Sequence, residues 1–161
     1  MKIEQLAWGM ARLSLGWIFF WAFWDKLLGL GFSTAPEKAW LLGNSPTYGF
    51  LAFGTSGPFA DIFKMMAGNF YIDILFMGGL FLIGGALILG IGMRIAGYAG
   101  ALLMAFMYLA VFPKEHAVFI DEHVVYAALL LLMAHIKVGQ YGGLGKWWAK
   151  QSFVKQNPFL E

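Results

Sequence analysis

Residues 6–30 read LAWGMARLSLGWIFFWAFWDKLLGL, and every later inference about the fold starts from them. At about 1.5 Å of rise per residue, an apolar helix of this length crosses a hydrocarbon core about 30 Å thick. Three ionisable residues nevertheless lie within it, namely Arg12, Asp25 and Lys26. Such side chains are costly at membrane depth, and they normally face the interior of a helix bundle. The segment therefore predicts a membrane-spanning helix with one polar face.

Arg12 and Lys26 lie on nearly the same face of that helix. They are fourteen residues apart, which at 3.6 residues per turn is close to four full turns and about 21 Å along the axis. Gly16, Phe19 and Phe23 lie on or beside the same line. We interpret this face as the one that packs against the rest of a bundle. In the alternative interpretation, Arg12 and Lys26 extend to the two membrane interfaces and act as topology anchors.

The composition is that of an integral membrane protein. Of 161 residues, 60% are hydrophobic and 12% are charged, which is about half the charged fraction of a soluble domain. This length predicts a single membrane domain over residues 1–161. The absence of cysteine from the sequence excludes disulfides, thiolate catalysis and cysteine-bound iron–sulfur or zinc sites. The net charge of +2 is small, and the sequence indicates no nucleic-acid partner.

Three further apolar segments are expected to cross the membrane. They are residues 70–89, 95–112 and 123–138, which together with 6–30 predict an all-α, integral membrane four-helix bundle. Small residues recur at four-residue spacing in the second and third segments, and this spacing lets membrane helices approach closely. The connection at residues 90–94 is short, so these two segments are expected to form an antiparallel hairpin. No P-loop lysine follows the glycines, so they indicate packing rather than nucleotide binding.

Residues 32–68 differ from the spans because glycine, proline and serine interrupt them repeatedly. The capping-box pattern at residues 34–37 predicts one short helix, and two more are expected to begin near Ser45 and Phe59. Many aromatic residues and few charges are typical of helices at a membrane interface, so we expect an interfacial lid in the first extracytoplasmic loop. A lid that only shields the ends of the bundle is the alternative.

Residues 139–161 form a polar tail in which Trp147 and Trp148 are expected to anchor at the interface. Four spans place both termini on one side of the membrane. Lysine and arginine are more numerous on that side and acids on the other, so the positive-inside rule places both termini in the cytoplasm. We therefore expect a multi-pass protein of the plasma (inner) membrane with its polar chemistry on the outer face.

The outer ends of the four spans hold the strongest candidates for chemistry. Lys26, Asp73, Asp121 and His123 are the candidate catalytic residues. A lysine suits an anionic substrate, and a histidine exchanges protons near neutral pH. The alternative is ordinary ion pairing of helix ends at the interface. We assign no metal site, because the histidines and acids between His116 and His123 match no known ligand spacing.

The first span carries Arg12, Gly16, Phe19 and Lys26 at spacings that resemble the opening of the DoxX/DoxD family of four-span membrane proteins. Similar positions continue over nearly the whole chain: Trp40 with GNSPTYGF at 43–50, GGALILG at 84–90 before Arg94, Gly97 and Gly100, Asp121 with His123 and Tyr126, and residues 139–147. One departure is Phe23, where the family often has a small residue.

The resemblance implies an activity linked to quinone. DoxD resembles a subunit of thiosulfate:quinone oxidoreductase, which oxidises thiosulfate to tetrathionate and passes the electrons to membrane quinone. On this basis Lys26 is expected to attract the thiosulfate dianion, and Arg12, Phe19 and Trp24 are expected to bind quinone as the electron acceptor. The chain offers no evident redox cofactor of its own. Membrane lipid, quinone and a partner membrane subunit or homo-oligomer are therefore the expected partners.

Two classes of function stay open at this point. The first is a component of an oxidoreductase that acts on thiosulfate or a related sulfur donor, and a buried cluster of Lys26, Asp73 and His123 would favour it. The second is a non-catalytic accessory or assembly subunit of a larger, respiratory-type membrane complex. Glycine surfaces that face lipid would favour that alternative. A carrier or channel is disfavoured, because no span carries a continuous line of polar residues.

Overall fold

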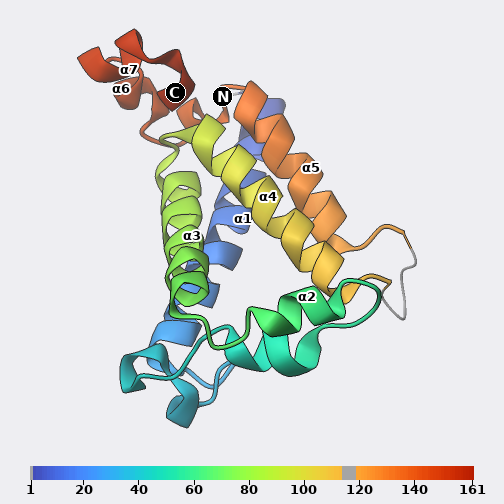
Figure 1. Ribbon diagram of the computed structural model, residues 1–161. Coiled ribbons are helices and arrows are strands. Elements are labelled where there is room, and N and C mark those ends of the chain that lie inside the picture. The colour runs from blue at the N-terminus through green and yellow to red at the C-terminus, as the bar shows by residue number, and fades with distance from the viewer. Residues whose placement is uncertain (1, 114–118) are drawn as a thin grey trace.

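The computed structural model describes residues 2–113 and 119–161 (Figure 1). Within these ranges the chain is helical and has no strand, so the expected all-α fold class is confirmed. The helices α1 (Ile3–Leu28), α3 (Phe70–Leu89) and α4 (Met93–Val111) are long and apolar enough to cross a membrane. Their bounds lie within three residues of the first three predicted spans.

The fourth predicted span, residues 123–138, is shorter in the structure than the sequence suggests. It corresponds to α5 (Glu122–His135), and Ile136 is already extended. At 1.5 Å per residue, this helix of 14 residues is about 21 Å long, which is less than the hydrocarbon core it would cross. The structure thus has three helices with the dimensions of a span and a shorter apolar fourth helix.

The three span-length helices and the shorter α5 associate as two antiparallel pairs. α5 packs along α4, α3 packs along α1, and a smaller contact between α3 and α4 joins the pairs. In Figure 1 both termini lie at one end, where the pairs meet, and the pairs diverge toward the opposite end, which we call the lid end. The buried core between the helices includes Phe19, Met77, Leu87, Leu130 and Met133.

Two glycines determine how closely the paired helices approach. A Cβ atom on Gly84 of α3 would lie 2.6 Å from the main-chain nitrogen of Phe20 on α1, and one on Gly97 of α4 would lie 2.6 Å from the carbonyl oxygen of Leu130 on α5. The prediction of packing glycines is confirmed at these positions. It does not extend to Gly78 and Gly85, because a Cβ atom there would meet nothing within 4 Å.

The segment between α1 and α3 forms the predicted series of short helices at the lid end. In Figure 1 this segment lies across the diverging ends of the long helices. Its side chains include apolar groups that are more than two thirds exposed, such as Leu42, Phe53 and Met65. The helical turns of this lid are η1 (Pro36–Lys38), η2 (Trp40–Leu42), η3 (Phe50–Gly54) and α2 (Ala60–Met65).

The tail folds back over the end that holds the termini. It makes hydrogen bonds to the end of α3 and the start of α4, through Leu144 N–H to Leu89 and through Arg94 N–H to the main-chain oxygen of Glu161. The tail therefore belongs to the packed structure. Its helical turns are η4 (Val138–Gln140), α6 (Gly145–Trp148), α7 (Ser152–Gln156) and η5 (Pro158–Leu160).

Candidate functional site

Arg12 is fully buried and binds main-chain oxygens. Its Nη1 donates to the carbonyl of Leu87 and, at 2.9 Å, to that of Ile88, and its Nη2 donates to Tyr141 at 3.3 Å. No ion pair joins Arg12 to an acid within residues 2–113 and 119–161. Its Nε has no hydrogen-bond acceptor in the same part of the chain. The guanidinium thus links α1 to the end of α3 and to the tail.

These contacts complete the hydrogen bonding at the carboxyl end of α3. The last four carbonyls of a helix have no partner within the helix, and a buried end must find partners elsewhere. Here the carbonyl of Ala86 accepts from Gly90, those of Leu87 and Ile88 accept from Arg12, and that of Leu89 accepts from Leu144. The positive charge also lies at the negative end of the α3 dipole. Arg12 therefore stabilises the packing of α1 against α3 and the tail. It lies at the opposite end of α1 from Lys26.

Lys26 is half-buried on the bundle-facing side of α1, two turns beyond the buried Phe19. Its ammonium group makes no hydrogen bond or ion pair to any residue that the structure describes. Phe23, one turn before it, packs on Phe81 of α3 with ring centroids 4.9 Å apart. Because α1 and α3 are antiparallel, Lys26 lies level with about Gly78. This level is about 7 Å along the helix axis from Asp73.

Asp73 fastens the lid to α3. The carboxylate is buried, and its Oδ1 accepts from the hydroxyls of Ser45 at 2.8 Å and Thr47 at 2.6 Å and from the Thr47 N–H at 3.3 Å. A charged acceptor strengthens each of these bonds. The Ser45-Pro-Thr47 segment is thereby held against the first turn of α3. No ion pair or hydrogen bond links Asp73 to Lys26 in the described structure.

Asp25, the neighbour of Lys26, has a similar structural function. Its carboxylate is buried and accepts from the Ser33 N–H at 2.9 Å, from the Ser33 hydroxyl at 2.7 Å and from the Phe32 N–H at 3.2 Å. These bonds close the loop that follows α1. Asp25 therefore binds residues of the loop after α1, although it is adjacent to Lys26 in the sequence.

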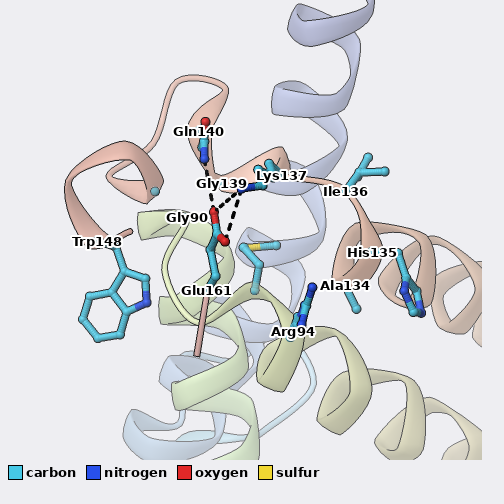
Figure 2. A pocket seen from close by; sticks show the side chains of 12 residues that line it. Gly90, Arg94, Ala134, His135, Ile136, Lys137, Gly139, Gln140, Trp148 and Glu161 are labelled. Carbon is cyan, nitrogen blue, oxygen red and sulfur yellow. Dashed lines mark hydrogen bonds and ion pairs between the residues drawn. The ribbon is translucent and has the colours of Figure 1, made fainter. Parts of the chain in front are cut away.

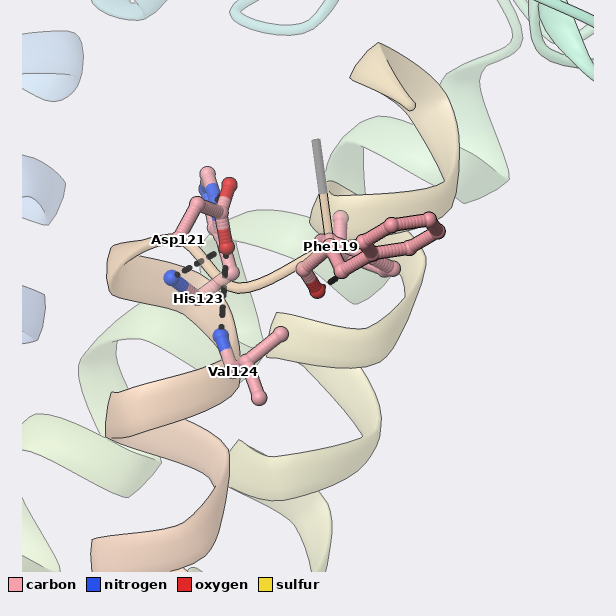
Figure 3. A network of polar contacts seen from close by, with 5 residues as sticks. Phe119, Asp121, His123 and Val124 are labelled. Carbon is pink, nitrogen blue, oxygen red and sulfur yellow. Dashed lines mark hydrogen bonds and ion pairs between the residues drawn. The ribbon is translucent and has the colours of Figure 1, made fainter. Parts of the chain in front are cut away.

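Asp121 and His123 form a pair at the start of α5 (Figure 3). Asp121 Oδ1 accepts from the N–H groups of His123 at 2.9 Å and Val124 at 3.3 Å, which is an N-cap. Its Oδ2 lies 2.8 Å from His123 Nδ1. A carboxylate only accepts, so Nδ1 carries the proton in this bond and Nε2 of a neutral ring is left as an acceptor. The dyad has the geometry of an oriented proton-exchange group.

Glu122 completes a group of potential metal ligands. One ligand atom each from Asp121, Glu122 and His123 lie within 4.8 Å of one another. His116, the other residue considered at this place, lies outside the described residues. Acidic groups close together are common in proteins that bind no metal ion, so this spacing alone does not assign a metal site here.

The aromatic residues expected at a quinone site lie on two faces of α1. Phe19 is in the core, with 2% of its surface exposed, whereas Trp24 is on the outside of the helix pair. Trp24 packs against Phe20 and Phe23, whose rings also contact Phe81. The result is a partly exposed aromatic surface, composed of Phe20, Phe23, Trp24 and Phe81, on the lid-side half of α1 and α3.

Of the predicted catalytic residues, the structure pairs Asp121 with His123 and links neither Lys26 nor Asp73 to them by a described polar contact. Sequence reasoning missed that Asp25 and Asp73 bind lid hydroxyls and amides. The signal for the Asp73 contacts is the pair of hydroxyl residues Ser45 and Thr47 on either side of Pro46, because a buried carboxylate needs such donors. It also missed the polar contacts of Glu161 with Lys137 and Gln140, which join residues more than twenty positions apart.

Comparisons of the sequence with models of protein families and with curated proteins, and of the structure with solved structures, return no match.

Proposed function

We propose that this protein is a DoxX/DoxD-like membrane subunit of a quinone-linked oxidoreductase, and that it binds the quinone head group at Lys26. The observation that carries the proposal is the half-buried side chain of Lys26, whose ammonium group has no acceptor among the described residues. A cation at membrane depth that has no hydrogen-bond acceptor is costly. A quinone carbonyl is an acceptor that would satisfy it.

The surroundings of Lys26 support a flat, apolar ligand. Phe23 is one turn away and continues into the aromatic surface of Phe20, Trp24 and Phe81, with neighbouring rings 4.9 to 6.0 Å apart. Offset and edge-to-face contacts with such rings stabilise a bound aromatic or quinonoid ring. An isoprenoid tail would then follow the exposed, lipid-facing side of Trp24, while Phe19 closes the interior behind the head group.

The chemistry of the proposed reaction balances when a donor is included. Two thiosulfate anions form one tetrathionate by making an S–S bond and releasing two electrons. The quinone takes up those two electrons and two protons to give the quinol. His123, oriented by Asp121 at 2.8 Å, is an acid–base group at the same end of the bundle. We assign delivery of the electrons to a partner subunit, because the sequence offers no evident redox cofactor.

The membrane arrangement is part of the same proposal. α5 completes a fourth pass with the help of the flanking residues, both termini lie in the cytoplasm, and the membrane is the plasma (inner) membrane. Both termini lie at one end in Figure 1, and the tail at that end carries Lys146, Lys150 and Lys155. The positive-inside rule favours this orientation. The lid then faces outward, where thiosulfate would arrive.

A second candidate is a non-catalytic accessory or assembly subunit. Two observations favour it over a self-sufficient enzyme: Asp25 and Asp73 have structural hydrogen bonds, and Gly78 and Gly85 have open space above them on the outer side of α3. Small residues without cover are typical of a surface where another membrane helix packs. In that case the protein would bind no quinone and Lys26 would contact a partner.

The test measures quinone binding and quinone reduction separately. Wild-type protein, Lys26→Met and the control Lys38→Met are purified in detergent, and binding of decyl-quinone is titrated without a donor. Lys38 is an exposed lysine of η1, so we expect its substitution to leave the bundle unchanged. We expect Lys26→Met to weaken binding about tenfold, the effect of one charge-assisted hydrogen bond, and Lys38→Met to bind as the wild type does.

Addition of thiosulfate then tests the reaction. Reduction by the wild type alone, lost in Lys26→Met, establishes the oxidoreductase. Reduction only with co-purified partners establishes the subunit role. Equal binding by wild type and Lys26→Met refutes the quinone site, and absence of binding by any variant leaves the accessory function as the better description.

A further inference from the structure

A cavity of about 60 Å³ lies at the end of the molecule that holds the termini (Figure 2). The turn between α3 and α4, the end of α5, and the tail enclose it, so three parts of the chain contribute to one site. Its lining includes the basic residues Arg94, His135 and Lys137, together with Gln140 and Trp148. The site is far from Lys26, and the quinone proposal does not involve it.

The cavity contains a carboxylate of the chain itself. Glu161 Oε1 lies 3.0 Å from Lys137 Nζ and accepts from Gln140 Nε2 at 3.3 Å, and Oε2 accepts from Lys137 Nζ at 3.3 Å. Figure 2 shows these side chains converging on Glu161. The main-chain oxygen of the same residue accepts from the N–H of Arg94, in the first turn of the 19-residue helix α4. Donors from three residues, at η4 and on α4, thus bind one acidic residue.

These donors suit an anion, and the contact with Glu161 is weak enough to exchange. The Lys137 side chain is 66% exposed and that of Glu161 is 28% exposed, and ion pairs this accessible contribute little to stability. The first-turn N–H groups of α4 add a favourable dipole for negative charge. An external anion with more acceptor atoms than a carboxylate can therefore replace Glu161.

The position of the site favours a lipid anion over a soluble one. Lys146 and Lys150 are close in sequence to the lining residues Gly145 and Trp148, and Trp147 between them is 55% exposed. The Trp148 indole donates to the carbonyl of Leu160 at 2.6 Å, which fixes an aromatic wall on the cavity. Tryptophan and lysine side by side are typical of the head-group region of a membrane, and basic pockets between helices bind anionic head groups there.

We propose that this cavity binds the phosphate group of an anionic membrane phospholipid, and that the carboxylate of Glu161 is an internal competitor for the same donors. Lipid binding would release Glu161 from Lys137 and Gln140 while the phosphate takes their hydrogen bonds. The connection between α3 and α4, the end of α5 and the tail would then be held together by a lipid instead of by the chain.

Native mass spectrometry in a neutral detergent tests this proposal with phosphatidylglycerol as the anionic lipid and phosphatidylcholine as the neutral one. Glu161→Gln removes the competing charge and keeps the shape of the side chain, so we expect it to raise the affinity for phosphatidylglycerol about threefold. Lys137→Ala removes a donor and should lower that affinity about fivefold. The control Lys64→Ala, on α2 at the lid end, should match the wild type.

The opposite signs of the two changes are the decisive result, because unfolding of the tail would lower binding in both variants. A loss or no change in Glu161→Gln overturns the proposal, as does an equal effect of Lys64→Ala and Lys137→Ala. Phosphatidylcholine carries the same phosphate diester but also a trimethylammonium group, which the basic lining repels, so we expect the wild type to bind it more weakly and the variants to change its binding less. Competition by inorganic phosphate as strong as that by phosphatidylglycerol overturns the lipid assignment and identifies a site for a soluble anion.

Discussion

The two halves of α1 each place a basic residue on the bundle-facing side, and the structure treats the two residues in opposite ways. Arg12 is fully buried and donates to three carbonyls of α3 and the tail. Lys26, fourteen residues later on the same side, is half-buried and has no acceptor in the described ranges. On the same face of α1, the basic side chain at one end therefore binds main-chain carbonyls, whereas the ammonium group at the other end has no described acceptor.

This difference separates the end that holds the fold from the end that can bind a ligand. At the end with the termini, Arg12 and Leu144 satisfy the carbonyls of α3. At the lid end the acids Asp25 and Asp73 bind the lid, and the nearby cation remains available. Satisfied main-chain carbonyls are expected where packing requires them, and a half-buried cation without an acceptor is a candidate for binding a ligand.

The largest effect is expected from Arg12→Met. Loss of the guanidinium leaves the buried carbonyls of Leu87 and Ile88 without donors, so we expect the free energy of unfolding to fall by about 3 kcal/mol. Unfolding in mixed micelles, followed by circular dichroism, measures this change. Arg12→Lys keeps the charge but not the fork of donors, and should be intermediate. Wild-type stability of Arg12→Met would show that the contacts of Arg12 do not hold this end together.

The next effect is expected at the contact between α1 and α3. Gly84→Ala would place a Cβ atom 2.6 Å from the Phe20 nitrogen, so the two helices must separate. We expect a loss of about 2 kcal/mol in the same unfolding experiment, as for other overpacked sites. Gly85→Ala is the matched control, because its Cβ would meet nothing within 4 Å. Equal losses in the two variants would contradict the assigned packing.

Asp73→Ala should affect the lid more than the bundle. It removes three hydrogen bonds from Ser45 and Thr47, and we expect lid opening to become easier by about 1 to 2 kcal/mol. Hydrogen exchange of residues 40–55 measures this opening, whereas α4 should exchange as before. Asp61→Ala, at an exposed position on α2, is the control. Unchanged exchange over the lid would mean that Asp73 does not fasten it.

The sequence predicts the helices well because hydrophobicity and turn residues are local signals. The bounds of α3 agree with residues 70–89, and Gly43 ends η2 in the left-handed conformation, as expected of a helix-ending glycine. The end of α5 was missed, because apolar residues continue to Val138 while the backbone is already extended at Ile136. Shortly after α5 ends, the backbone of Gly139 packs closely against that of Gly90. This contact is a tertiary feature that local sequence signals do not reveal.

The candidate site was less predictable, because the partners of a polar side chain depend on the fold. Asp73 was expected to lie with Lys26, but its hydroxyl partners come from 26 and 28 residues earlier. Arg12 was expected at a quinone, but its acceptors lie 75 to 129 residues away. The pair of Asp121 and His123 was accessible to sequence reasoning, because it lies within a single helix turn.

The smallest effect on stability is expected from Lys26→Met, and this variant tests most directly how the two ends of α1 differ. Methionine keeps the length of the side chain and removes a half-buried charge that has no described acceptor, so the free energy of unfolding should stay within about 1 kcal/mol of the wild type or rise. The same micelle unfolding experiment measures it beside Arg12→Met. A fall as large as that of Arg12→Met would mean that Lys26 has a structural partner, and the two ends of α1 would then be equivalent. Stability retained with quinone binding lost would instead assign the effect of Lys26 to the ligand, because the helices would still be packed when the binding group was gone.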